Sequence, residues 1–255
     1  MNSQDNELKQ LEHKLKTLFV KTFATYHLLE DNDKILVGLS GGKDSLFLLE
    51  MLAKRSKIDF PHFSVEAIHV RMDNIHYETS TGYLEQFCQS LGVPLHIVNT
   101  RFDVGGDSCH SGRDARRQKS PCFLCSWNRR KQMFNLAQEL GCNKIALGHH
   151  QDDIINTALM NLTFQGRFDT MPALLKMRKM PISIIRPLCA MCEADIKRYA
   201  ELSHYEKQTK LCPYETDSQR TGVKELFSTA EGLNPQARQS IWNALNRDGK
   251  LVESA

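Results

Sequence analysis

Residues 40–45 read Ser40-Gly41-Gly42-Lys43-Asp44-Ser45, directly after the apolar run Ile35-Leu36-Val37-Gly38-Leu39 and directly before Leu46-Phe47-Leu48-Leu49. This order predicts a strand, a tight turn and the start of a helix. Two adjacent glycines let the backbone turn so that several N–H groups point at one anion. The dipole of the helix and the charge of Lys43 strengthen that attraction. The residues predicted to bind phosphate are therefore Ser40, Gly41, Gly42, Lys43, Asp44 and Ser45.

The spacing of this turn excludes a Walker A loop, because the pattern Gly-x-x-x-x-Gly-Lys-Ser/Thr is absent. The hexapeptide resembles the pyrophosphate loop of the PP-loop ATPases, which cleave ATP between its α- and β-phosphates and leave AMP. The resemblance implies that residues 40–45 bind ATP. An ordinary glycine loop is the alternative, but it does not explain why the whole hexapeptide lies between a strand and a helix.

Apolar runs typical of strands alternate with helical stretches from about residue 34 to 205. This alternation predicts an α/β fold, a parallel sheet with helices on both faces, in which ligands bind beyond the carboxyl ends of the strands. Strands are expected at 34–39, 64–70, 94–98, 143–148 and 182–187. Helices are expected at 44–55, 79–91, 120–140, 152–164 and 192–203, with irregular connections at 99–120 and 165–181.

The chain is expected to have three parts. Residues 1–30 form an N-terminal helix packed on the core, since apolar residues recur there at spacings of three and four. Residues 31–205 form the PP-loop ATPase domain with an inserted Cys-x-x-Cys helix. Residues 206–255 form a loop that carries a cluster ligand and a tail of one or two helices from about 218.

Length and composition fit one large α/β domain, because the chain has 255 residues, of which 41% are apolar and 25% charged. No apolar stretch approaches the roughly 18 residues that a membrane span needs. The polar N-terminus lacks the basic-then-apolar layout of a signal peptide. These features predict a cytoplasmic protein with no membrane contact.

The net charge is only +3, but the basic residues are clustered. Local positive stripes suit a polyanion such as tRNA, and a solvated helix face is the alternative. The first cluster contains Arg113, Arg116, Arg117, Lys119, Arg129, Arg130 and Lys131, and the second contains Lys176, Arg178, Lys179 and Arg186.

Eight cysteines in a cytosolic chain indicate metal or redox chemistry rather than a disulfide framework. Cys122 and Cys125 form a Cys-x-x-Cys just before a basic helix, a spacing at which two thiolates can bind one metal centre. Cys189 and Cys192 form a second pair, and Cys212 stands alone. The spacing leaves zinc, an iron–sulfur cluster and dithiol redox chemistry open, including a zinc site made of the four cysteines of both pairs. Ordinary buried or loop cysteines are expected at Cys88, Cys109 and Cys142.

Four motifs follow one another along the chain. They are the glycine turn, the Cys-x-x-Cys at 122–125, Leu147-Gly148-His149-His150-Gln151-Asp152-Asp153, and Ile185-Arg186-Pro187-Leu188. Together they resemble the tRNA 2-thiocytidine synthetase family (TtcA), part of the TtcA/TtuA group of tRNA thiolases, over about residues 8–220.

The resemblance implies a 4Fe-4S cluster held by Cys122, Cys125 and Cys212, whose fourth iron can take a sulfide. Many family members have a second Cys-x-x-Cys at the distant site. Here Glu215 stands in place of its last cysteine, which makes Glu215 a candidate shield for the open iron. Cys189 and Cys192 match no cluster position.

The resemblance also implies roles at the nucleotide. Asp152 and Asp153 begin a predicted helix, where a capping role explains one of them readily. In the family the matching aspartates lie near the ATP phosphates and the reacting base, so we assign Asp153 to acid–base catalysis. Asp152 and Gly148 are assigned to the ATP site, with Mg2+ held against the phosphates. Of His149 and His150, one at most is expected to line this pocket.

Two further residues complete the predicted site. Arg129 matches a basic position of the group, where it stabilises phosphate or a sulfur anion or, alternatively, contacts tRNA phosphate. Adenine is expected against the backbone around His69, at the end of the second strand. The predicted catalytic set is Lys43, Asp153 and Arg129.

The predicted function is ATP-dependent tRNA thiolation. The C2 oxygen of a cytidine in the anticodon loop attacks the α-phosphate of ATP, and sulfur then displaces AMP. The expected partners are tRNA and a sulfur donor, either a cysteine desulfurase or sulfide, and a homodimer is left open. Two alternatives remain. One is another AMP-forming PP-loop enzyme, such as a tRNA thiouridine synthetase, a tRNA-lysidine synthetase or an amidating ligase, and the other is a catalytically inactive, zinc-stabilised tRNA-binding module.

Overall fold

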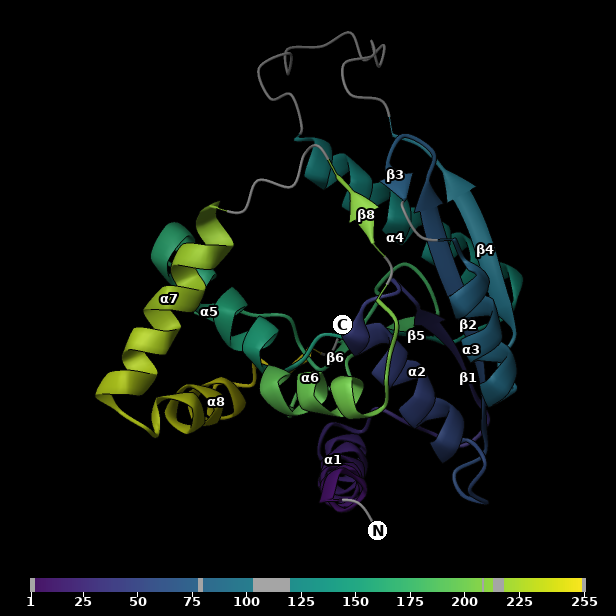
Figure 1. Ribbon diagram of the computed structural model, residues 1–255. Helices are drawn as coiled ribbons and strands as arrows, with labels where there is room; N and C mark the ends of the chain where they lie inside the picture. The colour runs from purple at the N-terminus through teal and green to yellow at the C-terminus, as the bar shows by residue number, and fades with distance from the viewer. Residues whose placement is uncertain (1–2, 78–79, 103–119, 208, 213–217, 254–255) are drawn as a thin grey trace, which may run out of the picture.

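A twisted central sheet forms the middle of the molecule (Figure 1). The computed structural model describes residues 3–77, 80–102, 120–207, 209–212 and 218–253. Over these residues the sheet has seven strands in the order β4-β2-β1-β5-β7-β6-β9. Their bounds in chain order are β1 (Asp33–Gly38), β2 (Phe63–Met72), β4 (Leu95–Thr100), β5 (Lys144–Ala146), β6 (Leu174–Lys176), β7 (Ser183–Ile185) and β9 (Val252–Glu253).

The sheet is parallel from β4 through β7, as the alternation of strands and helices predicts. Its exception is β6, which pairs antiparallel with β7 and parallel with β9. The predicted irregular connection 165–181 therefore contains a strand, which three residues are too few to reveal by periodicity. The carboxyl ends of the parallel strands all lie at one edge of the sheet.

Helices cover both faces of the sheet, which confirms the predicted fold class. The alternation within β1 shows the two layers, because Ile35 and Val37 belong to one apolar cluster and Leu36 to the other. The helices are α1 (Ser3–Tyr26), α2 (Lys43–Arg55), α3 (Gly82–Leu91), α4 (Pro121–Glu139), α5 (Gln151–Gln165), α6 (Glu193–Leu202), α7 (Ser218–Leu233) and α8 (Ala237–Arg247).

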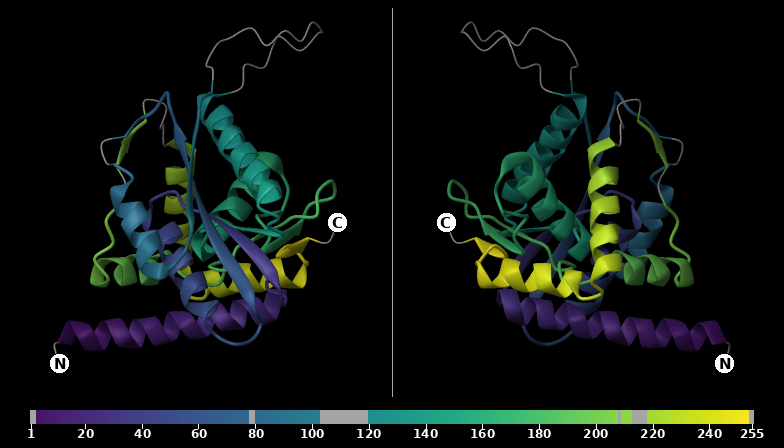
Figure 2. Two further views of the ribbon diagram at one scale, coloured as in Figure 1. Left: turned by 90° about the vertical axis from the view of Figure 1, so that its right-hand side faces the viewer. Right: turned by 90° about the vertical axis from the view of Figure 1, so that its left-hand side faces the viewer.

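The first core cluster lies under α1, α2, α3, α5 and α6, while α4 covers the second cluster on the other face. Figure 2 shows α1 and α8 side by side at the base, where Tyr26 Oη donates to Asn246 Oδ1 at 3.0 Å. α7 packs against α5. None of the described helices is long and apolar enough to cross a bilayer. The division of the chain into three parts stays a prediction.

A short ribbon stands apart from the main sheet. β3 (His76–Tyr77) pairs antiparallel with β8 (Lys210–Leu211), which joins the end of β2 to the segment that carries Cys212 (Figure 1). Each strand has two residues, too few for a period-two pattern, so the sequence did not predict the ribbon.

A buried ion pair fixes the amino ends of β1 and β5. Lys144 Nζ lies 2.6 Å from Asp33 Oδ2, and both side chains are nearly inaccessible. Asn143 Nδ2 donates to Asp33 Oδ1 at 2.7 Å, and Lys144 Nζ also donates to the Leu28 carbonyl at 3.0 Å. These hydrogen bonds satisfy both charges, so the pair sets the alignment of the two strands without leaving an unpaired ion.

We expect Asp33→Ala to lower the free energy of unfolding by ~3–5 kcal/mol, because it leaves the Lys144 ammonium buried without its partner. Urea unfolding followed by circular dichroism measures this loss. The control is Asp248→Ala at the exposed Arg247–Asp248 pair, which should stay within about 0.5 kcal/mol of the wild type. Equal stability of both variants would contradict the account of the pair.

Candidate nucleotide and cysteine sites

The loop between β1 and α2 has the geometry of an anion-binding turn. Gly41 has φ = 82°, in the left-handed region that favours glycine. Ser45 closes the turn, because its Oγ accepts from the Ser40 backbone N–H at 3.1 Å and donates to the Gly42 carbonyl at 2.9 Å. α2 begins at Lys43, so its first backbone N–H groups face the turn. The structure thus brings all six predicted phosphate-binding residues together.

The loop after β5 packs directly on this turn. β5 is the neighbour of β1 in the sheet, so both loops leave the same edge. A Cβ atom added to Gly148 would lie 3.1 Å from the carbonyl carbon and oxygen of Asp44 and 3.2 Å from the Ser45 nitrogen. Since these atoms are backbone, they cannot rotate away, and the approach of the two loops requires glycine at this position.

We expect Gly148→Ala to weaken ATP binding, because overpacking against backbone costs ~1–3 kcal/mol and separates the two loops. The Kd for ATP measured by calorimetry should rise about tenfold or more. The matched control is Gly222→Ala on α7, where an added Cβ meets nothing within 4 Å. That variant should bind ATP normally and gain up to ~1 kcal/mol of stability. Unchanged ATP affinity in Gly148→Ala would contradict this use of the close approach.

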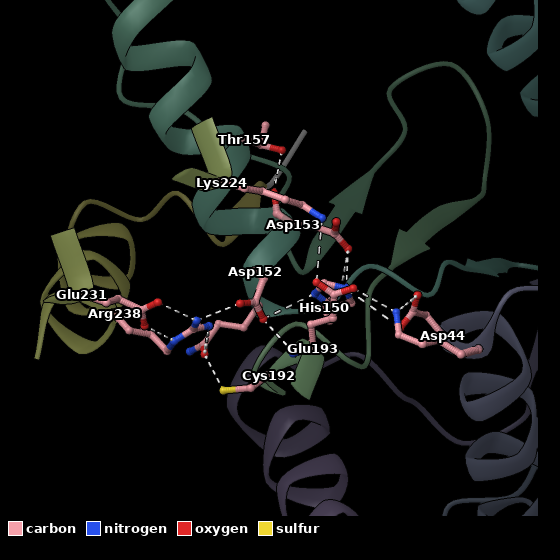
Figure 3. A network of polar contacts seen from close by, with 12 residues as sticks. Asp44, His150, Asp152, Asp153, Thr157, Cys192, Glu193, Lys224, Glu231 and Arg238 are labelled. Atoms are coloured by element: carbon pink, nitrogen blue, oxygen red, sulfur yellow. Dashed lines mark hydrogen bonds and ion pairs between the residues drawn. The ribbon is translucent and has the colours of Figure 1, made fainter. Parts of the chain in front are cut away.

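Lys43 is held by two carboxylates, those of Asp44 and Glu193, which Figure 3 labels. Its Nζ lies 3.1 Å from Asp44 Oδ2 and 3.1 Å from Glu193 Oε1. Burial by itself lowers the pKa of Lys43, but the two carboxylates outweigh it and hold the pKa above its ordinary value. Lys43 is therefore charged at neutral pH. Glu193 also lies 3.9 Å from Lys224 Nζ on α7, so α6 and α7 both contribute charges to this network.

The two aspartates at the start of α5 have different surroundings. Asp153 Oδ2 accepts from the His150 backbone N–H at 3.1 Å, and its side chain is 37% exposed. Asp152 is engaged at both oxygens, because Oδ1 lies 2.8 Å from Arg238 Nη2 and Oδ2 accepts from the Glu193 N–H at 2.7 Å. Asp153 faces solvent at the edge of the sheet, whereas Asp152 joins the starts of α5 and α6 to α8.

Arg238 docks the two C-terminal helices onto the site. Besides Asp152, it contacts Glu231 with Nε 2.9 Å from Oε1, and its guanidinium lies 4.9 Å from the centre of the Phe227 ring on α7. Burial by itself raises the pKa of Asp152, but the hydrogen bonds from Arg238 and from the Glu193 backbone hold it below its ordinary value of 3.8. Asp152 therefore stabilises the folded state as a carboxylate.

We expect this stabilisation to be complete above pH 3.8 and to decline as the pH falls through the lower pKa of folded Asp152. Asp152→Asn should lose ~1–3 kcal/mol at neutral pH and show a flatter loss of stability in acid. Urea unfolding across the acid range measures both effects. The double variant with Arg238→Ala should lose less than the sum of the single variants. An acid profile of Asp152→Asn identical to that of the wild type would contradict this assignment.

His150 is buried among the carboxylates. Its Nε2 lies 3.4 Å from Asp153 Oδ2 and 3.9 Å from Asp44 Oδ1, and its Nδ1 lies 3.6 Å from Asp152 Oδ2. Asp44 Oδ1 is itself buried and accepts no hydrogen bond from any described residue. A buried carboxylate oxygen without a donor beside a phosphate-binding turn has the chemistry that a Mg2+ ion prefers. Asp44 thus fits the expected metal.

His69 lies beneath the turn rather than in an open pocket. Its side chain is 2% exposed, and its Nδ1 donates to the carbonyl of Leu39 at 2.7 Å. Burial chiefly lowers the pKa of His69, with a smaller contribution from Arg129 and Arg71, so the ring is neutral at pH 7. The ring ties β2 to the residue before the turn. Its assignment to adenine binding stays a prediction.

Arg129 connects α4 to the ribbon beside Cys212. It lies on α4, and its Nη2 donates to Tyr77 Oη at 3.4 Å. Its Nε is buried and has no hydrogen-bond partner among the described residues. Tyr77 lies on β3, whose pairing with β8 places Cys212 nearby. One guanidinium therefore joins α4 to the ribbon beside Cys212 and keeps one N–H without a hydrogen-bond partner among the described residues.

The three predicted cluster ligands come from two segments. Cys122 is exposed and Cys125 is half-buried in the first turns of α4, and Cys212 follows β8. Cys125 and Cys212 border the same apolar cluster. Within the described residues, no three His, Cys, Asp or Glu side chains are placed to hold a metal ion. The three thiols have the chemistry of an iron–sulfur site.

A zinc site that joins the first cysteine pair to the second finds no support. Cys189 is fully buried in the first core cluster, on the opposite face of the sheet from Cys125. Burial raises its pKa to about 12, so it is a poor thiolate at neutral pH. Cys192 caps α6 and donates to Gln151 Oε1 at 3.4 Å. Both residues therefore have structural roles in the segment that connects β7 to α6.

Comparison with known proteins identifies the family. Residues 7–212 match the PP-loop domain family. The chain is 33% identical to the tRNA-cytidine(32) 2-sulfurtransferase of Aliivibrio salmonicida over 95% of its own length and 77% of the relative. It is likewise 33% identical to tRNA-cytidine(32) 2-sulfurtransferase 1 of Francisella tularensis subsp. novicida, over 96% and 90% of the two chains. The chain belongs to the tRNA-cytidine(32) 2-sulfurtransferase family of PP-loop proteins.

A solved structure supports this placement of the chain in the sulfurtransferase family. The U34-tRNA thiolase NcsA from Methanococcus maripaludis, solved with its [4Fe-4S] cluster, superposes with a TM-score of 0.73. The two sequences are 27% identical, and the match covers 96% of this chain and 81% of NcsA. The predicted family is confirmed.

The predicted basic clusters include one residue, Arg186, for which an RNA-binding role is wrong. Arg186 is only 6% exposed and donates through Nη1 to the Pro172 carbonyl. Burial lowers its pKa to about 10. A guanidinium that binds a buried carbonyl cannot reach an RNA phosphate, so in this sulfurtransferase family member Arg186 is structural. Several predicted residues lie outside the described residues: Arg113, Arg116, Arg117, Lys119, Cys109 and Glu215.

Sequence reasoning missed three residues of the site. Glu193 and Arg238 are single charges on amphipathic helices, and they carry no local signal that distinguishes them from solvent-facing residues. Tyr77 was missed because β3 was missed. The motif Arg186-Pro187-Leu188, followed by Cys192 and an acidic residue, was the nearest available signal for Glu193, since it places a helix start at the same sheet edge.

Proposed function

We propose that this chain replaces the C2 oxygen of a cytidine in a tRNA anticodon loop with sulfur, at the expense of ATP, which leaves as AMP and pyrophosphate. It is a tRNA-modifying sulfurtransferase of the family named above. The observation that carries the proposal is the guanidinium of Arg129. Its Nη2 donates to Tyr77 Oη beside the Cys212 segment, and its buried Nε has no hydrogen-bond partner among the described residues. An N–H of this kind can donate to an anion that enters the site.

The ATP step uses the turn and its neighbours. The backbone N–H groups at the start of α2 and the ammonium of Lys43 bind the phosphates. Lys43 is held by Asp44 and Glu193 in the structure, so nucleotide binding exchanges Glu193 for phosphate oxygen. Asp44, through its buried oxygen without a donor, would hold Mg2+. The C2 oxygen attacks the α-phosphorus, the bond to the β-phosphate breaks, and pyrophosphate leaves.

In our proposal, Asp153 accepts a proton from the reacting cytosine and later returns it. O-Adenylation places a positive charge on the cytosine ring, and loss of a proton from the exocyclic amine neutralises it. The carboxylate of Asp153 is partly exposed and is held by the His150 backbone, which suits a group that takes up and returns this proton. Sulfur then forms a bond to C2, the C2–O bond breaks, and AMP leaves with both electrons. The exocyclic amine regains its proton from Asp153.

Arg129 stabilises negative charge during displacement. Its buried Nε lacks a partner among the described residues, so it can donate to the departing phosphate or to the incoming sulfur. Cys122, Cys125 and Cys212 would hold a 4Fe-4S cluster, which would supply an iron site for sulfide. In this proposal, free sulfide or a cysteine desulfurase supplies the sulfur. The reaction takes place in the cytoplasm, where tRNA is found.

A second candidate is thiolation of uridine rather than cytidine. The observation in its favour is the structural match to NcsA, a U34-tRNA thiolase. Both reactions use the same activation and displacement, so residues of the ATP site do not discriminate them. The curated relatives, at 33% identity over nearly the whole chain, favour cytidine.

The experiment is mass analysis of tRNA nucleosides from cells that lack this protein. We expect 2-thiocytidine to be absent and to return when the wild-type gene is restored. Cys122→Ala, Cys125→Ala and Cys212→Ala should not restore it, because each removes a cluster ligand. Cys192→Ala and Cys189→Ala are the matched controls and should restore it. Loss of a thiouridine instead would move the protein to the second candidate function, and full restoration by Cys212→Ala would contradict the ligand set.

A further inference from the structure

The outward face of α4 carries two exposed aromatic side chains beside the cysteines. Phe123 is 44% exposed and Trp127 is 50% exposed. Arg130 and Lys131 are also exposed and follow at the spacing that continues the same helical stripe. We call these four residues, Phe123, Trp127, Arg130 and Lys131, the α4 outer face.

The opposite side of the helix accounts for the packing of α4. Cys125, Met133 and Ala137 meet the second core cluster, and the Met133 sulfur lies 3.1 Å from the position that a Cβ on Gly38 would take. The aromatic residues of the outer face are therefore not needed to hold α4 on the sheet. Large exposed aromatic side chains clustered outside a core mark a surface that binds something.

The charge of this face selects a polyanion. Lys131 Nζ lies 5.5 Å from the centre of the Trp127 ring, within the range of a cation–π contact. Arg130 is oriented by hydrogen bonds from Nε and Nη2 to Ser126. Aromatic planes with adjacent cations are the combination with which proteins bind single-stranded nucleic acid, because every base has a face that stacks and every phosphate is an anion.

We propose that the α4 outer face stacks unpaired bases of the tRNA anticodon loop while Arg130 and Lys131 bind the flanking phosphates. The inference rests on the proposed function and names the part of the tRNA that the enzyme holds. Cys122 lies next to Phe123 in the chain, so the stacked bases lie beside the cysteines. A cytidine must leave its stack to react, and its neighbours then need new stacking partners.

This mode of binding selects structure rather than sequence. Stacking on an aromatic ring tolerates any base, so the α4 outer face distinguishes an open loop from a duplex and leaves the choice of nucleotide to the reaction site. The face should therefore accept an anticodon-loop hairpin of altered loop sequence and reject a fully paired RNA of similar length.

The test measures the affinity of anaerobically purified, cluster-loaded protein for a fluorescein-labelled RNA hairpin with an anticodon-loop sequence. Stacking contributes ~1–3 kcal/mol per base, so Trp127→Ala should raise the Kd about tenfold or more, whereas Trp127→Phe should retain most of the affinity. The matched control is Phe60→Ala, which removes a 71% exposed aromatic ring from the loop at the amino end of β2 and should leave the Kd unchanged. Lys131→Ala should reduce the salt slope by about one.

Tryptophan fluorescence tests stacking directly. The chain has two tryptophans, and the second, Trp242 on α8, is buried. Single-stranded hairpin should quench the emission of Trp127, duplex RNA should not, and Trp127→Phe should abolish the quenching. Wild-type affinity of Trp127→Ala would overturn the proposal, as would equal quenching by duplex. Quenching by hairpin in a protein whose loss leaves all tRNA thiolation intact would contradict the proposed function while leaving the RNA-binding face in place.

Discussion

The site depends on the contact between two backbone loops at the carboxyl edge of the sheet. β1 and β5 are parallel neighbours, so the turn after one and the loop after the other must share space. Gly148 allows this, since a Cβ there would come within 3.1 Å of the Asp44 backbone. The contact sets the position of the start of α5 relative to the start of α2, and with it the distance between the acidic loop and the phosphate-binding turn. The aspartates and Lys43 derive their geometry from this approach.

Electrostatic pairing then draws distant segments to the same edge. Glu193 on α6 contacts Lys43, and Arg238 on α8 contacts Asp152 (Figure 3). On the other side, Arg129 and Tyr77 connect α4 with the ribbon that ends near Cys212. The nucleotide half of the site is closed by ion pairs from the C-terminal helices. The predicted cluster ligands come from the first turns of α4 and from the residue after β8.

Much of the fold and part of the site could be predicted from the sequence. The glycine turn, the acidic loop at the start of α5 and the Cys-x-x-Cys are local patterns, and each depends on residues close in the chain. The ribbon of β3 and β8 could not be predicted, because two-residue strands leave no periodicity. Arg238 looks like any surface charge until α8 is placed, and Arg186 looked like an RNA ligand until its burial was seen. These features all depend on contacts between segments that are far apart in the sequence.

We propose that one site couples ATP cleavage to sulfur transfer. A single-turnover reaction of cluster-loaded enzyme with ATP, sulfide and unmodified tRNA tests it most directly. We expect AMP and 2-thiocytidine to form in equal amounts, because each adenylated base reacts with one sulfur atom and releases one AMP. Formation of AMP without thiocytidine in the presence of sulfide, or of thiocytidine without AMP, would contradict it.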